Sequence, residues 1–310
     1  MSKIAFLFSG QGAQTVGMGK ELAEHYPAAD RVFDEASESL GLDMKRMIWE
    51  SDEETLKITE NTQPAVVTMS VAALRVLQEE GVKPDVVAGL SLGEYSAHVA
   101  AESVTFSDAV KLVRKRGKYM QEEVPVGKGA MAAVIGMDDA GVYAVCEKAQ
   151  EFGIVSPANF NCPGQITVAG ETAAVEKACE IAKEMGAKRA IMLAVSAPFH
   201  CSMLTGAGEK LAKEMENVTF GELKTPLITN VTADYVMSAE EIKPLLVRQV
   251  SSSVLWEKSV RRMLADGFDT FIEVGPGKAL SGFMKKIDKE VSILNVEDMK
   301  SLEATLAAVK

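Results

Sequence analysis

A serine between two glycines is the strongest chemical signal in this sequence. The run Gly89-Leu90-Ser91-Leu92-Gly93 follows a Val-rich stretch and precedes an Ala-rich stretch with helical spacing. A serine placed in this way, on a sharp strand-to-helix turn, is typical of a nucleophile elbow. The glycines let neighbouring chain approach closely, and the free N–H groups at the start of the helix favour developing negative charge. We expect Ser91 to be a nucleophile; a plain strand-to-helix turn is the alternative.

A serine nucleophile needs a base, and the sequence contains 3 histidines. His25 has Glu and Tyr neighbours and is expected at the surface. His98 lies two helical turns beyond Ser91, roughly 10 Å along the axis, which is too far for a hydrogen bond, so we expect it in the core. His200 follows a Pro-Phe break in a loop, where catalytic side chains often lie, and we predict it as the base. Its neighbour Cys201 is disfavoured as a nucleophile, since adjacent side chains diverge.

No Asp or Glu stands where it would complete a triad in the order serine, acid, histidine. We therefore expect a backbone or amide carbonyl to orient the imidazole. The loop Ser9–Gln14, after an expected strand, lacks the pattern of a phosphate loop. It is interpreted as backbone that lies close to another group, with a flexible turn as the alternative.

Arg116 is a cation on the apolar side of an expected helix at 108–122, for which Ser107 is the expected N-cap. The other bases of this helix fall on the opposite, solvent-facing side. A buried guanidinium needs an anionic partner. Two interpretations stay open: an internal salt bridge to Asp or Glu, and the carboxylate of a substrate held by the guanidinium fork.

Composition and charge limit the classes of protein to which the chain can belong. The chain has 310 residues and a net charge of 33 − 44 = −11, which argues against nucleic acid or an anionic membrane as the main partner. We expect no secretory signal and no membrane span, because no apolar stretch approaches roughly 20 residues. The 4 cysteines are far apart and without metal-ligand spacing. We expect free thiols, no metal site and a cytoplasmic location.

The hydrophobic pattern predicts strands alternating with helices, which is typical of a doubly wound α/β fold with its site at the carboxyl ends of the strands. Expected strands in this larger part are 3–8, 86–89, 227–230 and, as the last, 270–274. Expected helices are 22–40, 44–49, 65–80 opened by Gln63-Pro64, 108–122, 203–215, 242–250, 254–266 and a tail from residue 301.

Residues 127–196 show a different order of strands and helices. The expected order is strand 130–135, helix 139–152, strands 155–160 and 165–169, helix 173–185 and strand 188–195. This βαββαβ order predicts a ferredoxin-like subdomain. We therefore expect residues 127–196 to be inserted in a larger domain made of residues 1–126 and 197–310.

Several motifs together resemble one family, the malonyl-CoA:acyl carrier protein transacylases of bacterial fatty acid synthesis, over essentially the whole chain. They are Phe8-Ser9-Gly10-Gln11-Gly12, Gly89-Leu90-Ser91-Leu92-Gly93-Glu94, Arg116, Asn159-Phe160-Asn161, His200, Arg248-Gln249 with Trp256, and Glu273-Val274-Gly275-Pro276-Gly277. The resemblance implies an α/β-hydrolase-like core with a parallel sheet that carries a ferredoxin-like subdomain.

The resemblance also implies roles for single residues. Ser91 would be the nucleophile and His200 its base, and the Gln249 position would supply the carbonyl that orients the histidine. The backbone N–H groups of Gln11 and Leu92 would form the oxyanion hole. Arg116 would bind the free carboxylate of the malonyl group, which decides the question left open above in favour of substrate.

Two positions bear on how closely the family pattern is followed. Leu90 stands where many members carry a histidine before the serine, so no second imidazole assists there. Phe199 precedes the base, and in related polyketide acyltransferases phenylalanine at this position goes with malonyl and serine with methylmalonyl. We therefore expect Phe199 to contribute to the choice of malonyl.

The expected partners are malonyl-CoA and an acyl carrier protein, with no cofactor of the enzyme itself, since coenzyme A belongs to the substrate and phosphopantetheine to the carrier. Carrier docking is expected at one of two basic groups, Lys188-Arg189 or Lys285-Lys286-Lys289. We expect a monomer. The alternatives are a trans-acting polyketide synthase acyltransferase, a serine thioesterase or hydrolase on the same core, and a non-catalytic docking scaffold.

Overall fold

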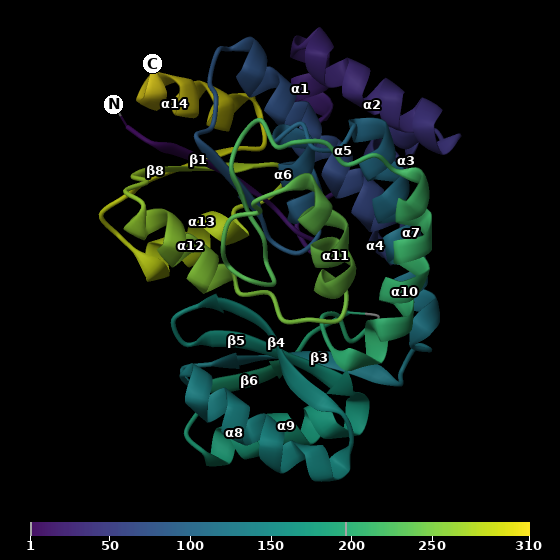
Figure 1. The fold of residues 1–310 in the computed structure, drawn as a ribbon, viewed down its shortest axis with the longest axis vertical. Coiled ribbons are helices and arrows are strands. Elements are labelled where there is room, and N and C mark those ends of the chain that lie inside the picture. The colour runs from purple at the N-terminus through teal and green to yellow at the C-terminus, as the bar shows by residue number, and fades with distance from the viewer. Residues whose placement is uncertain (1, 196) are drawn as a thin grey trace.

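The computed structural model describes residues 2–195 and 197–310, in which the strands form two separate sheets (Figure 1). The larger sheet has five parallel strands in the order β7-β2-β1-β8-β9. Their bounds are β1 Ile4–Phe8, β2 Val86–Gly89, β7 Leu227–Ile228, β8 Thr270–Val274 and β9 Ser292–Val296. Parallel pairing brings the carboxyl ends of β1, β2 and β8 together, with Phe8 opposite both Gly89 and Val274.

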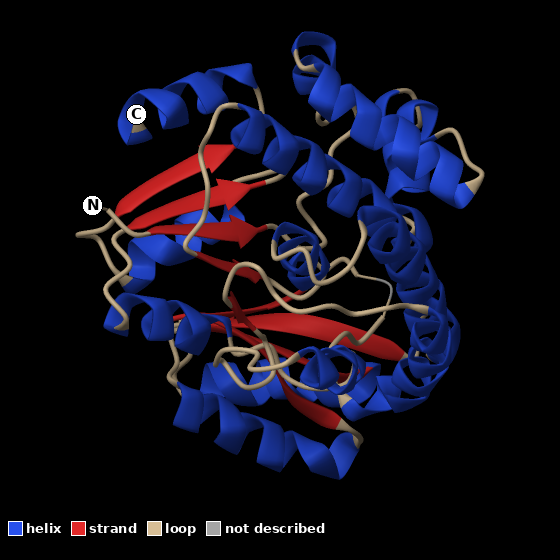
Figure 2. Cartoon of the chain, turned by 45° about the horizontal axis from the view of Figure 1, so that its top comes forward, coloured by secondary structure: helices blue, strands red, loops and turns tan. Residues whose placement is uncertain are grey.

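Helices cover both faces of the larger sheet (Figure 2). Their bounds are α1 Lys20–His25, α2 Pro27–Leu40, α3 Met44–Trp49, α4 Glu53–Lys57, α5 Thr59–Glu79, α6 Gly93–Ala100, α7 Phe106–Glu123, α10 Thr205–Glu214, α11 Ala239–Gln249, α12 Trp256–Ala265, α13 Ala279–Ile287 and α14 Met299–Val309. One apolar core fills the space between the sheet and α5, and a second joins the opposite face to α12 and α13. The central strands β1 and β2 are buried on both faces, and their sequences are accordingly apolar throughout rather than alternating. β8 is also buried, although it carries Thr270 and Glu273.

The smaller sheet is antiparallel, in the order β4-β5-β3-β6, and has its own core (Figure 1). Its strands are β3 Gly129–Ile135, β4 Val155–Cys162, β5 Gln165–Glu171 and β6 Arg189–Met192, and its helices are α8 Asp139–Ala149 and α9 Thr172–Glu184. This is the ferredoxin-like arrangement, so the predicted fold class is confirmed. The boundary expected at residue 196 lies outside the described residues, and the division into two domains stays a prediction.

The two sheets meet along β4. The N–H group of Phe160 donates to the carbonyl oxygen of Val254 at 2.9 Å, and the N–H group of Val254 donates to that of Ala158 at 2.8 Å. The segment that leads into α12 thus pairs with β4. The face of the smaller sheet opposite α8 and α9 is thereby held toward the carboxyl ends of the larger sheet.

The expected starts of two helices were wrong. The helix placed at 65–80 begins at Thr59, with Pro64 inside it, because the carbonyl oxygen of Ile58 accepts from Asn61 and Thr62 and starts the helix earlier. The N-cap of α7 is Thr105 rather than Ser107, since the Thr105 hydroxyl accepts from the N–H group of Asp108.

The strand at 270–274 is not the last one. β9 follows it and pairs with β8 at the edge of the sheet. Most of β9 is only half-buried, so its sequence lacks the continuous apolar run that identified the central strands. The helix expected at 22–40 is likewise divided into α1 and α2 at Tyr26, before Pro27.

Candidate active site

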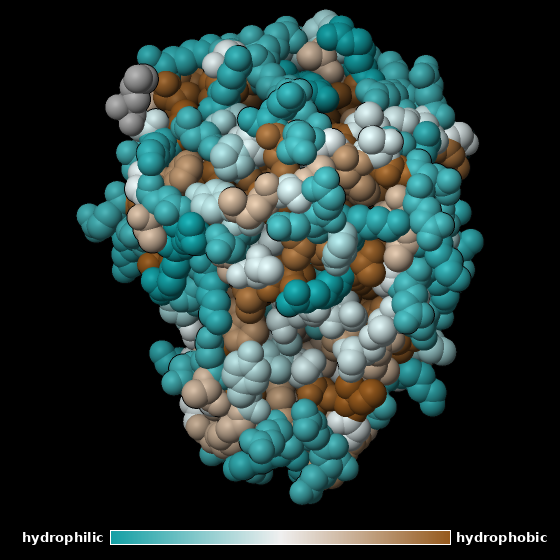
Figure 3. Space-filling view, viewed as in Figure 1, coloured by the Kyte–Doolittle hydropathy of each residue, from teal (hydrophilic) through white to brown (hydrophobic). Residues whose placement is uncertain are grey.

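A cavity of about 560 Å³ lies between the larger and the smaller sheet. Its wall includes the loop after β1, the turn after β2, the side chains of β3, β4 and β5 that face away from α8 and α9, and the start of α13. Apolar side chains are visible in the middle of the molecular face in Figure 3, with polar residues along the left and right margins. The cavity therefore lies at the carboxyl ends of parallel strands, where α/β proteins commonly bind ligands.

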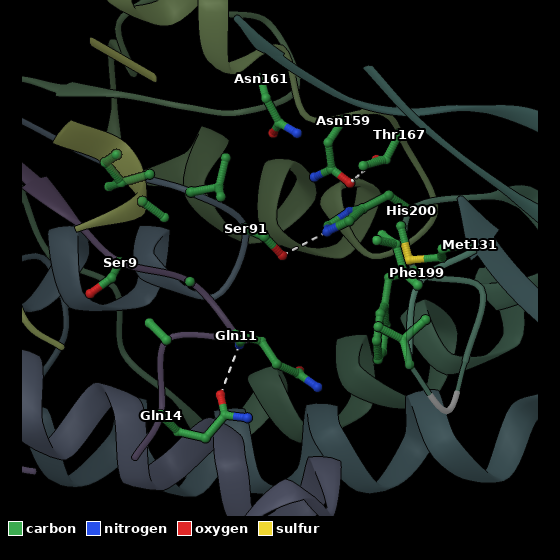
Figure 4. Close-up of a pocket in the computed structure, with 18 of the residues that line it drawn as sticks. Ser9, Gln11, Gln14, Ser91, Met131, Asn159, Asn161, Thr167, Phe199 and His200 are labelled. Atoms are coloured by element: carbon green, nitrogen blue, oxygen red, sulfur yellow. Dashed lines mark hydrogen bonds between the residues drawn. The ribbon is translucent and has the colours of Figure 1, made fainter. Parts of the chain in front are cut away.

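The serine stands on a strained turn between β2 and α6. Its φ is 51°, in the left-handed region, which costs a residue other than glycine about 1–3 kcal/mol. The flanking glycines are needed for space: a Cβ on Gly89 would lie 2.0 Å from the carbonyl carbon of Gly93, and one on Gly93 would lie 2.1 Å from the Phe8 carbonyl oxygen. The turn projects the Ser91 hydroxyl into the cavity (Figure 4).

His200 is the histidine that contacts Ser91. Its Nε2 lies 2.6 Å from Ser91 Oγ, and its Nδ1 lies 2.9 Å from the backbone carbonyl oxygen of Gln249 (Figure 4 shows the first contact). A carbonyl can only accept, so Nδ1 carries the proton and Nε2 is free to accept the serine proton. Burial, and secondly the charge of Arg116, lowers the pKa of His200 to about 3, so the ring is neutral at pH 7.

No carboxylate contacts His200 in the described parts of the chain. The carbonyl expected at the Gln249 position is thus the backbone one. The side chain of Gln249 has other contacts: its Nε2 donates to the backbone carbonyl of Ser91 at 2.9 Å and its Oε1 accepts from Arg116 at 3.1 Å.

Arg116 is 2% exposed and points to the serine. Its Nη2 lies 3.3 Å from Ser91 Oγ, and its Nη1 donates to Gln63 Oε1 at 3.0 Å. Its guanidinium carbon also lies 5.7 Å from the centroid of the Tyr95 ring. Among residues 2–195 and 197–310, no Asp or Glu forms an ion pair with Arg116. The described residues therefore do not contain the internal salt bridge that was one of the two interpretations of Arg116.

α5 and α7 bring Gln63 and Arg116 together. A Cβ on Gly117 would lie 2.6 Å from the Thr59 carbonyl oxygen, so the two helices touch through backbone at this point. Gln63 is fully buried, and its Nε2 lies 3.3 Å from Gln11 Oε1. From the sequence, Gln63 was expected only to open a helix, and this contact was not predicted.

The two backbone amides expected to hold an oxyanion lie beside the serine. Gln11 is in the loop after β1, where a Cβ on Gly10 would lie 2.7 Å from the Leu90 carbonyl oxygen, and Leu92 immediately precedes α6. The N–H groups of Gln11 and Leu92 have no protein acceptor among the hydrogen bonds of the described residues. The Ser91 N–H group, in contrast, is occupied by Asn230.

Phe199 and Leu90 both lie in the cavity wall, and Phe199 is 9% exposed. Met131 from β3 and the Asn159–Thr167 pair from β4 and β5 complete the opposite wall, with Thr167 Oγ1 donating to Asn159 Oδ1 at 2.7 Å. Phe199 therefore lies where a residue that selects the acyl group must lie. Its role in the choice of malonyl stays a prediction.

The side chains that sequence reasoning set aside lie elsewhere. His25 is exposed, and His98 is buried with its Nδ1 2.8 Å from Ser103 Oγ. Cys201 is buried and its Sγ donates to the Pro198 carbonyl oxygen at 3.1 Å. Burial raises the pKa of Cys201 to about 11, so it remains a thiol rather than a nucleophilic thiolate.

Asn230 and Glu94 are buried polar residues around the turn that sequence reasoning did not assign. Asn230 follows β7 and contacts the backbone on both sides of Leu90. The available signal was a Thr-Asn pair at the end of the strand expected at 227–230, and a glutamate directly after the second glycine of the turn.

In the parts of the chain that the structure describes, no group of three or more His, Cys, Asp or Glu side chains is arranged to hold a metal ion. No helix there is long and apolar enough to cross a membrane.

Comparisons with known proteins agree on one class. The model of the acyl transferase domain family matches residues 5–304. The malonyl CoA-acyl carrier protein transacylase of Bacillus subtilis is 49% identical over 100% of this chain and 98% of its own length. The crystal structure of the corresponding transacylase from Clostridium perfringens has a TM-score of 0.97 at 49% identity, covering 99% of this chain and 97% of that one.

A further solved structure is a malonyl-transacylase in complex with a type II PKS acyl-carrier protein. Its TM-score is 0.97 at 43% identity, and the match covers 99% of this chain and 100% of that one.

Proposed function

The chain belongs to the acyl transferase domain family, and from that premise we propose how its cavity transfers a malonyl group from coenzyme A to an acyl carrier protein. The enzyme is an acyl-carrier-protein S-malonyltransferase that supplies malonyl groups for fatty acid synthesis. Ser91 carries the malonyl group between the two thiols.

One observation supports the choice of malonyl most strongly. Arg116 is a buried cation without an ion pair in the described residues, and its Nη2 lies 3.3 Å from the Ser91 hydroxyl oxygen. A buried guanidinium is costly unless an anion compensates it. An acyl group with a free carboxylate supplies that anion once its carbonyl carbon is at Ser91, whereas an acetyl group does not.

In the first half-reaction, the malonyl carboxylate binds Arg116 and the thioester carbonyl lies over Ser91. His200 takes the hydroxyl proton through Nε2 as the serine oxygen attacks the carbonyl carbon. The carbonyl oxygen becomes negative and is stabilised by the N–H groups of Gln11 and Leu92, each contributing about 3 kcal/mol to lowering the barrier. The intermediate then collapses, and His200 returns the proton to the departing sulfur of coenzyme A.

In the second half-reaction, the phosphopantetheine thiol of the carrier enters the same cavity. His200 takes the thiol proton, the sulfur attacks the malonyl-serine ester, and Ser91 leaves with the proton back on its oxygen. The Gln249 carbonyl keeps the imidazole in one tautomer through both halves. The charge of the imidazolium is transient, which suits a base without a carboxylate partner.

Carrier docking is proposed at the lysines of α13. Ala279, Leu280 and Phe283 of this helix lie in the cavity wall, and Lys285 and Lys286 follow them on the same helix. Both lysines are exposed. A net charge of −11 leaves few basic surfaces, and a carrier of acidic surface needs one. The alternative group, Lys188-Arg189, is exposed at the sheet edge formed by β6.

We also propose that the enzyme acts in the cytoplasm, on the ground that its Cys residues are free thiols. We propose that it acts as a monomer, because one chain supplies every residue used in the two half-reactions above. Light scattering at micromolar concentration tests the oligomeric state, and a stable dimer would contradict it.

The function is tested by following the malonyl group from one thiol to the other. The enzyme is mixed with labelled malonyl-CoA and a carrier protein with its phosphopantetheine arm, and the label on the carrier is compared with free malonate. Label on the carrier in large excess over free malonate supports transfer. Malonate in excess even when the carrier is saturating would support the hydrolase alternative.

A further inference from the structure

The backbone of the catalytic turn is held by one buried side chain, that of Asn230. Its Nδ2 donates to the Gly89 carbonyl oxygen at 2.7 Å, and its Oδ1 accepts from the Ser91 N–H group at 2.6 Å. The sheet places it there, since β7 lies beside β2 with Ile228 opposite Ala88. A left-handed serine persists only where its surroundings hold it, and Asn230 holds both sides of the turn.

Asn230 is itself held by Glu94, from the first turn of α6. The N–H group of Asn230 donates to Glu94 Oε2 at 2.8 Å, and the Thr229 hydroxyl donates to Glu94 Oε1 at 2.9 Å. Glu94 is fully buried. Every hydrogen bond that its side chain makes within the described residues comes from a donor, so a carboxylate fits this position and an amide NH₂ group does not.

The same carboxylate reaches the support of the base. Gln249 Nε2 donates to Glu94 Oε2 at 3.0 Å and to the Ser91 carbonyl oxygen at 2.9 Å. The backbone carbonyl of Gln249 accepts from His200 Nδ1 at 2.9 Å. Glu94 is therefore the common anchor of two chains of contacts, one ending at the nucleophile and the other at the base.

We propose that Asn230 and Glu94 are positioning residues for the transfer reaction: they fix Ser91 and His200 at hydrogen-bond distance without touching the substrate. The proposal rests on the proposed function, because it concerns the rate of serine acylation. It assigns to this buried carboxylate the place of the missing triad acid, with one difference. Glu94 acts through Asn230 and Gln249 and does not contact the imidazole.

The test is the rate of malonyl-serine formation in the full-length Asn230→Ala and Glu94→Gln variants, measured by rapid quench and intact mass. We expect each variant to acylate about 100-fold more slowly, the loss typical of a misplacement near 1 Å. The loss is the same for malonyl-CoA and acetyl-CoA, because the turn and not Arg116 is disturbed. Binding of malonyl-CoA, measured by calorimetry with Ser91→Ala added to each variant, stays within twofold of Ser91→Ala alone.

Thr305→Ala is the matched control. Thr305 is buried in α14 and its hydroxyl donates to the Asn295 carbonyl oxygen at 2.9 Å, so the variant also loses a buried hydrogen bond, but far along the chain from the turn. We expect its acylation rate to stay near that of the wild type. Thermal unfolding of all variants separates lost stability from lost rate.

Several results would overturn the proposal. The first is an acylation rate near that of the wild type in either folded variant. The second is a loss of substrate binding without a loss of acylation rate, and the third is a slower acylation with malonyl-CoA alone. The fourth is failure of both variants to fold, which would show that the two residues support the fold. Absence of a malonyl-serine in the wild type would instead contradict the proposed function. In that case the reaction of Ser91 with a fluorophosphonate probe still tests whether Asn230 and Glu94 hold the turn.

Discussion

The Nη2 atom of Arg116, from α7, lies 3.3 Å from the Oγ atom of Ser91, which stands on the turn before α6. The cation is buried, and burial lowers its pKa while leaving it charged at neutral pH. A charge fixed beside a nucleophile selects the substrate by its charge. Truncation of Arg116 should therefore change which acyl group is transferred.

In Arg116→Ala, kcat/KM for malonyl-CoA should fall by about 100-fold or more, as expected for a lost charge-assisted pair of about 3 kcal/mol. Transfer of acetyl from acetyl-CoA should be unchanged or faster, because a buried unpaired charge is removed. Arg114→Ala is the matched control, since Arg114 lies on the outer side of the same helix and pairs with Glu60. Equal losses for malonyl and acetyl in Arg116→Ala would contradict the role of Arg116.

Phe199→Ser should enlarge the cavity beside the base. Phe199 is 9% exposed and forms part of the cavity wall, so its removal leaves room for a branched acyl group. We expect the ratio of kcat/KM for methylmalonyl-CoA over malonyl-CoA to rise about tenfold, which is the range for one methyl group in an apolar pocket. Competition between the two thioesters, followed by mass of the acyl carrier product, measures this ratio. An unchanged ratio would exclude Phe199 from the choice of acyl group.

The base should remain active in mild acid. Burial and the nearby Arg116 charge lower the pKa of His200 to about 3, so Nε2 stays unprotonated well below the ordinary histidine pKa. We expect kcat/KM for malonyl-CoA, which reports the free enzyme, to show no fall near pH 6.5. Initial rates between pH 5 and pH 8 in a buffer of constant ionic strength test this expectation. A tenfold loss by pH 5.5 in the folded enzyme would contradict it.

Stability should respond to acid through the buried histidines. Burial also lowers the pKa of His98 to about 3. Between about pH 3 and pH 6.5 the unfolded chain binds a proton at this position and the folded chain does not, so the free energy of unfolding falls as the pH is lowered. At pH 5 the loss is about 2 kcal/mol for His98.

Urea unfolding at pH 7 and pH 5, in the wild type and in His98→Gln, isolates this contribution. Buried Glu94 and Glu273, whose carboxyl pKa values are raised, act in the opposite direction in both proteins and cancel in the comparison. The variant should lose about 2 kcal/mol less than the wild type on acidification. Parallel losses in the two proteins would show that His98 does not resist protonation in the folded state.

Most of the fold was predictable from local sequence patterns. The serine turn was predictable because glycines on both sides, a buried strand before and a helix after all agree on one conformation. The inward side of α7 was predictable because the helical period places Arg116 beside Val113 and Met120. The order of strands and helices in residues 127–196 predicted the ferredoxin-like sheet, since each element there has a clear apolar face.

Contacts between distant buried polar residues were not predictable in the same way. Gln63 and Asn230 have polar partners 53 and 139 residues away in the chain, and such a separation leaves no trace in the local sequence pattern. Gln63 was obscured further by Pro64, which favours a helix start although the chain begins the helix at Thr59. β9 escaped notice because an edge strand that is half-buried needs no continuous apolar run.

Ser91 carries a covalent malonyl group in the proposed mechanism, and intact mass measures this group directly. The enzyme is incubated with malonyl-CoA in the absence of carrier protein, quenched in acid and weighed beside Ser91→Ala treated in the same way. We predict one malonyl group on the wild type, located on the peptide that contains Ser91, and none on the variant. An unmodified wild type, or an adduct that persists in Ser91→Ala, would contradict the account.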